Sequence, residues 1–173
     1  MLSVSPTEVD FACPSLPPET PLEVAVETAS GVTEPVKMVM RSAAPRIFGL
    51  DGSGQNQGLV SFVGTTELAM PRNAQVPAHP AQPGDEILIW GTGFGSSDWT
   101  PGTTVSVKAG GVDAEVEAVS AVPGHVGVYA VQVRVPVPTA FGERVPVQLE
   151  MIGADGKVFH SNSVTIAVEP GME

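Results

Sequence analysis

The fold is decided by three alternating segments, Tyr129-Ala-Val-Gln-Val-Arg-Val-Pro136, Val145-Pro-Val-Gln-Leu149 and Val164-Thr-Ile-Ala-Val168. Apolar and polar residues alternate along them, which is typical of β-strands with one buried face. A similar series occurs earlier in the chain, as Thr7-Glu-Val-Asp-Phe-Ala-Cys-Pro14, Leu22-Glu-Val-Ala-Val26 and Val36-Lys-Met-Val-Met40. The chain therefore contains an internal repeat made of strands.

The two copies differ in what precedes them. Strand-like sequence at roughly 80–128 precedes the second copy, whereas the first copy starts almost at Met1. We therefore expect the first module to lack its opening strands. A half-module of this kind has an uncovered apolar face and unpaired strand edges, and both need a partner.

Composition narrows the fold class and the partners. The 173 residues include 19 Gly and 17 Pro, which leave no room for long helices and favour short strands joined by turns. A net charge of −11 with 8 Lys and Arg argues against nucleic acid and anionic membranes as partners. No apolar run reaches the roughly 18 residues of a membrane span, and no signal peptide is visible at Met1.

We expect two domains separated by a linker. Residues 1–70 form the incomplete module, and residues 85–173 form the complete one. Between them, 71–84 is rich in proline, which predicts an extended, stiff connection.

Several hairpins are expected from the positions of glycine and proline. In the first module, 2–12 is predicted to be one half-buried strand, and 22–28 is predicted to pair with 35–40 around Ser30-Gly31. A shorter hairpin is predicted across Gly64-Thr65. In the second module the predicted strands lie near 85–91, 103–108, 113–119, 127–135, 144–151, 157–160 and 163–168.

Two groups of residues carry a family resemblance. Pro83-Gly-Asp-Glu-Ile-Leu-Ile-Trp-Gly-Thr-Gly-Phe-Gly95, Val105-Ser-Val-Lys-Ala-Gly-Gly111 and Ser161-Asn-Ser-Val-Thr-Ile-Ala-Val168 resemble an IPT/TIG immunoglobulin-like domain. With Val4-Ser-Pro-Thr-Glu-Val-Asp-Phe11, Ala44-Pro-Arg-Ile-Phe48 and Gly127-Val-Tyr-Ala-Val-Gln-Val-Arg-Val-Pro136, the whole chain is similar to the uncharacterised C-terminal domain family of secreted Solibacter-type proteins.

This resemblance implies an all-β protein of two tandem immunoglobulin-like antiparallel β-sandwiches, the first incomplete on its N-terminal side. It also implies an extracellular, non-enzymatic bacterial protein, and it supplies no catalytic residues. Members of the family usually have more sequence before the position of Val4.

Candidate chemical sites are weak. Gly91-Thr-Gly-Phe-Gly95 lacks the spacing of a dinucleotide loop, so we interpret it as a strand end that turns sharply. Residues 51–56 have one carboxylate of a calcium loop, and an interface loop is the favoured interpretation. His79, His125 and His160 have no metal-ligand spacing, and Cys13 is expected to be a buried structural thiol. No cofactor and no metal are expected.

Two tryptophans are interpreted differently. Trp90 alternates with Leu88 on one strand face, which predicts core packing. Trp99 lies in the polar loop Ser96-Ser-Asp-Trp-Thr-Pro-Gly102 and is a candidate contact for a sugar or a neighbouring subunit. The alternative is a loop anchor that packs on its own domain.

The leading hypothesis is a structural or adhesive protein, outside the cell or on its surface, that assembles into a homo-oligomer or polymer. Strands of one subunit would complete the open module of the next. The apolar residues expected at that interface are Leu2, Val4, Val9 and Phe11. The alternatives are a polysaccharide- or protein-binding module and a passive C-terminal part of a larger secreted protein; an enzyme is not expected.

Overall fold

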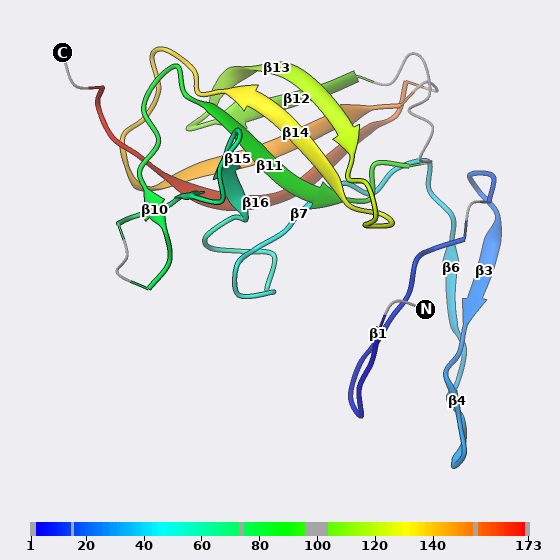
Figure 1. Cartoon of the computed structure of the whole chain (residues 1–173). Coiled ribbons are helices and arrows are strands. Elements are labelled where there is room, and N and C mark those ends of the chain that lie inside the picture. The colour runs from blue at the N-terminus through cyan, green and yellow to red at the C-terminus, as the bar shows by residue number, and fades with distance from the viewer. Residues whose placement is uncertain (1–2, 15, 73–74, 96–103, 154–155, 172–173) are drawn as a thin grey trace. The chain divides into compact units, whose positions relative to one another are not determined.

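The computed structural model describes residues 3–14, 16–72, 75–95, 104–153 and 156–171. Within these ranges the regular elements are strands, and no helix is present. The expected all-β class is confirmed (Figure 1).

The chain divides into an N-terminal unit, Met1–Ser42, and a C-terminal unit, Ala43–Glu173. The strands of the N-terminal unit are β1 (Ser3–Val4), β2 (Val9–Asp10), β3 (Pro21–Val24), β4 (Glu27–Thr28), β5 (Gly31–Val32) and β6 (Val36–Val39). Those of the C-terminal unit are β7 (Arg46–Ile47), β8 (Val60–Phe62), β9 (Leu68–Ala69), β10 (Ala78–His79), β11 (Glu86–Thr92), β12 (Thr104–Ala109), β13 (Val112–Ala121), β14 (Tyr129–Arg134), β15 (Gly142–Ile152) and β16 (Val158–Val168).

This division differs from the expected one. The predicted linker 71–84 belongs to the C-terminal unit, because β10 pairs with β9 and Ala81 is fully buried. The Ala81 amide donates to the Ala167 carbonyl at 2.9 Å. Prolines are tolerated at a sheet edge where no amide is needed, so a Pro-rich segment does not have to be a spacer.

The N-terminal unit consists of antiparallel pairs. β1 pairs with β2, β3 with β6, and β4 with β5, each as a two-stranded sheet. The predicted hairpin around Ser30-Gly31 is confirmed by the last two pairs. Two-stranded pairs are only marginally stable in water without a layer packed on them.

The C-terminal unit is one curled ten-stranded sheet in the order β10-β9-β8-β11-β14-β13-β12-β15-β16, with β7 pairing to β11. The short hairpin predicted across Gly64-Thr65 is confirmed by the pairing of β8 with β9. The predicted strands 157–160 and 163–168 form a single strand, β16.

The curl depends on β13, which pairs with β12 through residues 112–114 and with β14 through residues 115–121. A register shift between Val116 and Ala118 marks a bulge, which bends the strand. Two groups of strands consequently face one another across one core, which includes Ile87, Ile89, Val131, Val133, Val147, Leu149, Val164 and Ile166.

The two ends of the curled sheet meet through parallel bridges. Gln57 lies beside Thr165, and Ala81 lies beside Val168. The side chain of Asn162 reinforces this closure, since it accepts the Ile47 amide at 2.8 Å and donates to the Ile47 carbonyl at 2.9 Å. The last strand is thereby joined to the first strand of the same unit.

The two copies of the internal repeat pair their strands in the same register. In the N-terminal unit Leu22 lies opposite Met38 and Val24 lies opposite Val36. The corresponding pairs of the C-terminal unit are Val145 with Ile166 and Val147 with Val164. The sequence repeat aligns these residues one for one, so the β3–β6 hairpin is the counterpart of β15–β16.

The β1–β2 hairpin matches the end of β13 and the start of β14 in the same way. Val4 lies opposite Val9, as Val119 lies opposite Val131. The described residues of the N-terminal unit therefore contain counterparts of β14, β15, β16 and the end of β13. They contain no counterpart of β11 or β12.

The glycines after β11 permit a close backbone contact, which agrees with the sharp turn expected there. Gly93 has φ 78°, and a Cβ atom at this residue would lie 1.9 Å from the Ala44 carbonyl oxygen. The Ala44 amide donates to the Gly93 carbonyl at 2.8 Å. Glycine at this position lets the start of the C-terminal unit lie against β11.

We predict that Gly93→Ala strongly destabilises the C-terminal unit. A left-handed backbone alone costs an L-residue about 1–2 kcal/mol, and the contact with Ala44 adds a steric overlap that backbone movement must relieve. The matched control is Gly64→Ala, because Gly64 has φ 76° and open space around its Cβ position. Denaturant unfolding followed by tryptophan fluorescence should show a much larger loss for Gly93→Ala; equal losses would contradict the steric argument.

Candidate functional site

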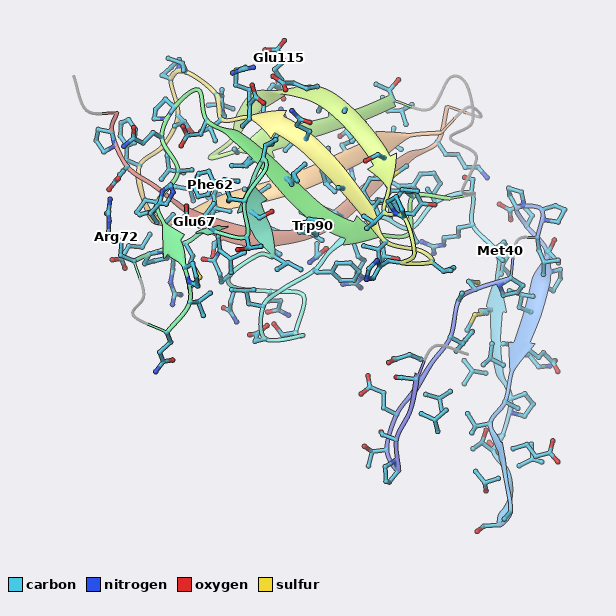
Figure 2. All side chains as sticks on the ribbon, in the orientation of Figure 1. Met40, Phe62, Glu67, Arg72, Trp90 and Glu115 are labelled. Carbon is cyan, nitrogen blue, oxygen red and sulfur yellow. The ribbon has the colours of Figure 1, made fainter. Side chains whose placement is uncertain are left out.

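The N-terminal unit has an uncovered apolar surface, which we call the open face. It is formed by the apolar residues that match buried or half-buried positions of the C-terminal unit: Val4, Val9, Phe11, Leu22, Val24, Val36 and Met38. Their exposed fractions include 59% for Val4, 49% for Phe11 and 61% for Val36. No described residue among 3–42 is buried (Figure 2).

The matching residues of the C-terminal unit have much lower exposed fractions. Val147, Val164 and Ile166 are each 0% exposed, because strands of the opposite group pack over them. Their counterparts in the N-terminal unit have the same pairing, but the described residues there leave them unburied. The open face therefore carries residues that match both sides of a core: Val9 and Phe11 match β14, and the residues of β3 and β6 match β15 and β16.

Three of the four predicted interface residues lie within the described residues. Val4 and Val9 face each other across the β1–β2 pair, and Phe11 follows two residues after Val9, while Leu2 lies outside the described residues. The single strand predicted over 2–12 is wrong. β1 ends at Val4 because a turn begins at Ser5. The Ser5 amide donates to the Glu8 carbonyl at 2.8 Å, and the Ser5 hydroxyl accepts the Glu8 amide at 3.0 Å.

Cys13 is exposed, so the prediction of a buried thiol is wrong for this chain as it stands. The repeat aligns Cys13 with Val135, which is 1% exposed in the C-terminal unit. The apolar environment expected for this thiol is thus present in the complete module and absent from the open one.

The β3–β6 hairpin has a shallow hollow of about 250 Å³ on its surface. Leu22 and Met38 line it, together with Pro21, Glu23, Lys37 and Val39. An exposed ion pair of 3.5 Å joins Lys37 to Glu23 beside the hollow. The hairpin therefore offers an apolar depression with a polar border.

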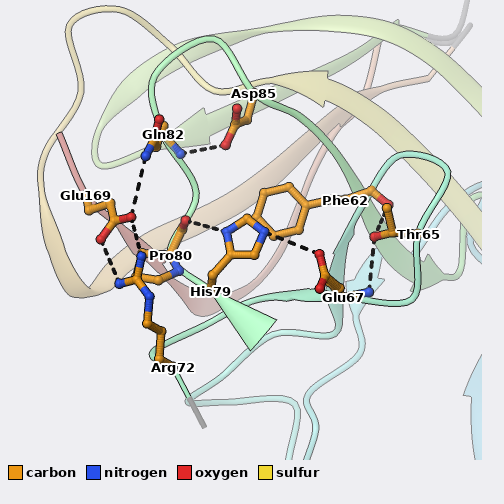
Figure 3. Close-up of polar contacts among 9 residues, drawn as sticks. All are labelled: Phe62, Thr65, Glu67, Arg72, His79, Pro80, Gln82, Asp85 and Glu169. Carbon is orange, nitrogen blue, oxygen red and sulfur yellow. Dashed lines mark hydrogen bonds and ion pairs between the residues drawn. The ribbon is translucent and has the colours of Figure 1, made fainter. Parts of the chain in front are cut away.

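A cluster of polar side chains lies in the C-terminal unit, where the curled sheet closes (Figure 3). Arg72 donates to both carboxylate oxygens of Glu169, at 2.9 and 2.8 Å. These hydrogen bonds raise the pKa of Arg72 and lower the pKa of Glu169. Because Glu169 also donates its amide to the Ala81 carbonyl, the pair fastens the end of β16 to the 71–84 segment.

His79 belongs to the same region and not to a linker. Its ring stacks on Phe62 with centroids 4.1 Å apart, and its Nε2 lies 3.5 Å from a Glu67 oxygen. Its Nδ1 is 3.0 Å from the Pro80 carbonyl oxygen. The contacts with Phe62 and Glu67 join β10 to β8 and to the residue before β9, so the ring has a structural role.

An open hollow of about 490 Å³ adjoins this cluster. Its charged lining residues are Arg72, Glu143 and Glu169, and Arg72 is already bound to Glu169 on both nitrogens. The described lining includes no His, Cys, Ser or Lys that could act as a nucleophile or a base. This arrangement supports closure of the sheet.

The 51–56 loop uses its carboxylate internally. Asp51 accepts the Ser53 amide at 3.0 Å, the Ser53 hydroxyl at 2.6 Å and the Asn56 side-chain amide at 3.3 Å. These hydrogen bonds lower the pKa of Asp51. The described residues hold no cluster of three His, Cys, Asp or Glu suited to a metal ion.

The structure does not place Trp90 in the core, although the sequence predicted core packing. Ile87, Ile89 and Gly91 form the buried face of β11, so core packing of Trp90 with Leu88 is wrong. Trp90 lies half-buried on the other face and donates its indole N–H to the Ser61 hydroxyl at 3.0 Å. Trp99 lies outside the described residues.

The outer face of β11, β14 and β13 carries a charged cluster that sequence analysis missed. Arg134 binds Glu86 at 2.8 Å and also Glu117, while Glu115 lies 3.9 Å away. Gln132 joins the same two glutamates, at 3.1 and 2.8 Å. The bulge in β13 brings Glu117 to this face, and a bulge leaves no clear sign in a single sequence.

Comparison with protein-family models, characterised proteins and solved structures gave no match. Among the described residues, no helix is long and apolar enough to cross a membrane. The function must therefore be argued from the chain's own geometry.

We predict that the Arg72–Glu169 pair makes the C-terminal unit sensitive to acid. The pKa of Glu169 is lowered below its ordinary value of 4.5 in the folded state, so its contribution is complete above that value. The contribution is lost as the pH falls through the lowered pKa. Glu169→Gln should reduce stability at pH 7 and flatten the loss of stability on acidification.

The matched control is Glu115→Gln, because Glu115 is more exposed and lies 3.9 Å from Arg134. Thermal unfolding between pH 3 and pH 7 makes the comparison. Identical pH profiles for the wild type and Glu169→Gln would show that the pair contributes nothing to stability.

Proposed function

We propose that this chain is a non-enzymatic structural or adhesive subunit that assembles with other copies of itself through the N-terminal unit. The observation that carries the proposal is the open face, whose described residues have the strand register of a folded core and are not buried. Exposed apolar surfaces of this kind mark interaction sites. The unpaired strand edges beside it favour recognition by β-strand addition.

The magnitudes favour an interface that uses both the open face and the strand edges. Burying one Val, Phe or Met side chain contributes about 1.5–3 kcal/mol. Val4, Phe11, Val36 and Met38 are 42–61% exposed, so burying the rest of these side chains would together contribute roughly 3–6 kcal/mol. Association costs about 4–15 kcal/mol, so this apolar contribution reaches only the lower part of that range, and main-chain hydrogen bonds would supply the remainder.

The finer fold assignment belongs to the same proposal. The C-terminal unit has two groups of antiparallel strands facing across one core, as an immunoglobulin-like sandwich of the IPT/TIG type would have. The N-terminal unit would be a second, incomplete sandwich. A location outside the cell or on its surface follows from the resemblance to secreted Solibacter-type proteins.

We predict that Val36→Asp weakens assembly, because the interface would bury an unpaired carboxylate. The control is Val126→Asp, since Val126 is 68% exposed in the C-terminal unit and Val36 is 61% exposed. Light scattering and negative-stain microscopy should show smaller particles for Val36→Asp alone. Equal assembly of both variants would rule out the open face, and a monomeric wild type would overturn the proposed function.

We also predict that assembly protects Cys13 from thiol reagents. The thiol is exposed in the single chain and corresponds to the buried Val135 of the complete module. Its modification rate should therefore fall as the protein concentration rises, and mild urea that dissociates the particles should restore it. A rate that is independent of particle size would place Cys13 outside the interface.

A further inference from the structure

We propose that β3 pairs antiparallel with the β3 strand of a second copy, centred on Val24. This inference rests on the proposed self-assembly and names its joint. The described residues pair β3 with β6 on one edge and place no strand on the other. In the C-terminal unit, the matching strand β15 has β16 on one edge and β12 on the other.

The repeat identifies which main-chain groups lie on the free edge. Glu23 matches Pro146, whose carbonyl accepts the Gly110 amide at 2.8 Å at the β12 side of β15. Val26 directs its amide and its carbonyl to Thr33, on the β6 side of the hairpin. Since these groups alternate along a strand, Glu23 and Ala25 present theirs on the free edge.

A second copy of β3 fits this edge because the missing strand must run antiparallel, as β12 does along β15. Antiparallel pairing of two identical strands obeys a two-fold axis, and such an interface is self-complementary. With the axis at Val24, Leu22 of one copy lies opposite Val26 of the other. All three apolar side chains then point toward the open face of the joined hairpins.

Repulsion between like charges disfavours the alternative register, in which the two strands would be centred on Glu23. Centring on Glu23 would place two glutamates directly opposite each other, which is unfavourable. Centring on Val24 places Glu23 opposite the uncharged Ala25, while Lys37 remains 3.5 Å from Glu23 on the other side. A shift by a single residue would turn the apolar side chains to the outer face.

The pairing also extends the open face. The joined sheet has the order β6-β3-β3-β6, and the apolar residues of both copies line the same side of it. It completes the edge of β3 and leaves edges of β1, β2 and β6 unpaired among the described residues. A second self-complementary contact at one of these edges would allow assembly to continue beyond a dimer.

The test is disulfide cross-linking in a Cys13→Ser background of the full chain, which removes the native thiol. Val24→Cys should give a covalent dimer on mild oxidation. Residues opposite each other in a non-hydrogen-bonded antiparallel pair have Cα atoms about 4.5 Å apart, within the range that a disulfide requires. The control is Val36→Cys, because three strand spacings separate its two copies by roughly 14 Å.

A second pair of variants tests the register without touching the apolar side chains. Glu23→Cys and Ala25→Cys, each in the same background, should cross-link severalfold more when mixed than when alone. In the proposed register these two positions are directly opposite, whereas identical positions are diagonal and about 7–8 Å apart.

The outcomes separate the joint from the wider proposal. Dimers of Val24→Cys with little from Val36→Cys, and a mixture that exceeds its components, support the β3 joint. Light scattering that shows assembled particles without these cross-links would overturn the joint and leave self-assembly standing. Monomeric protein in every sample would overturn both.

Discussion

A strand in water requires a partner for its edge and a cover for its apolar face, and the rest of the structure depends on how that requirement is met. In the C-terminal unit β13 pairs with both groups of strands, so a single sheet curls until its two ends meet. The inner faces of its main strands are then covered by another part of the same sheet. The described part of the N-terminal unit follows the same pairing rules, and its β1 matches only the end of β13.

Comparison of the two units separates the effect of strand pairing from the effect of a covering layer. Matching cross-strand pairs differ in exposure: Val147 and Val164 are buried, whereas Val24 is half-buried and Val36 is exposed. Local sequence therefore sets the register of a hairpin, while burial depends on a layer contributed by other strands. This separation explains why a segment can have the sequence of a core strand and lie at the surface.

Much of the C-terminal unit follows from alternation and turn residues. The strands between 85 and 168 were predicted because period-two patterns and Gly-containing turns are local signals. The domain boundary was not predictable, since Ala81 is held by hydrogen bonds to the distant strand β16. The buried face of β11 was misassigned because both of its faces carry apolar residues, Ile87 and Ile89 on one and Leu88 and Trp90 on the other. The pairing of Arg72 with Glu169 depends on a separation of 97 residues, which no local pattern reveals.

The closure by Asn162 also determines when the chain can fold. Its bonds to Ile47 join residues 115 positions apart, so the C-terminal unit cannot complete its core until β16 has left the ribosome. The hairpins of the N-terminal unit join residues close in sequence and are synthesised earlier. The hairpins of the N-terminal unit can therefore form from neighbouring residues while the C-terminal unit still waits for its last strand.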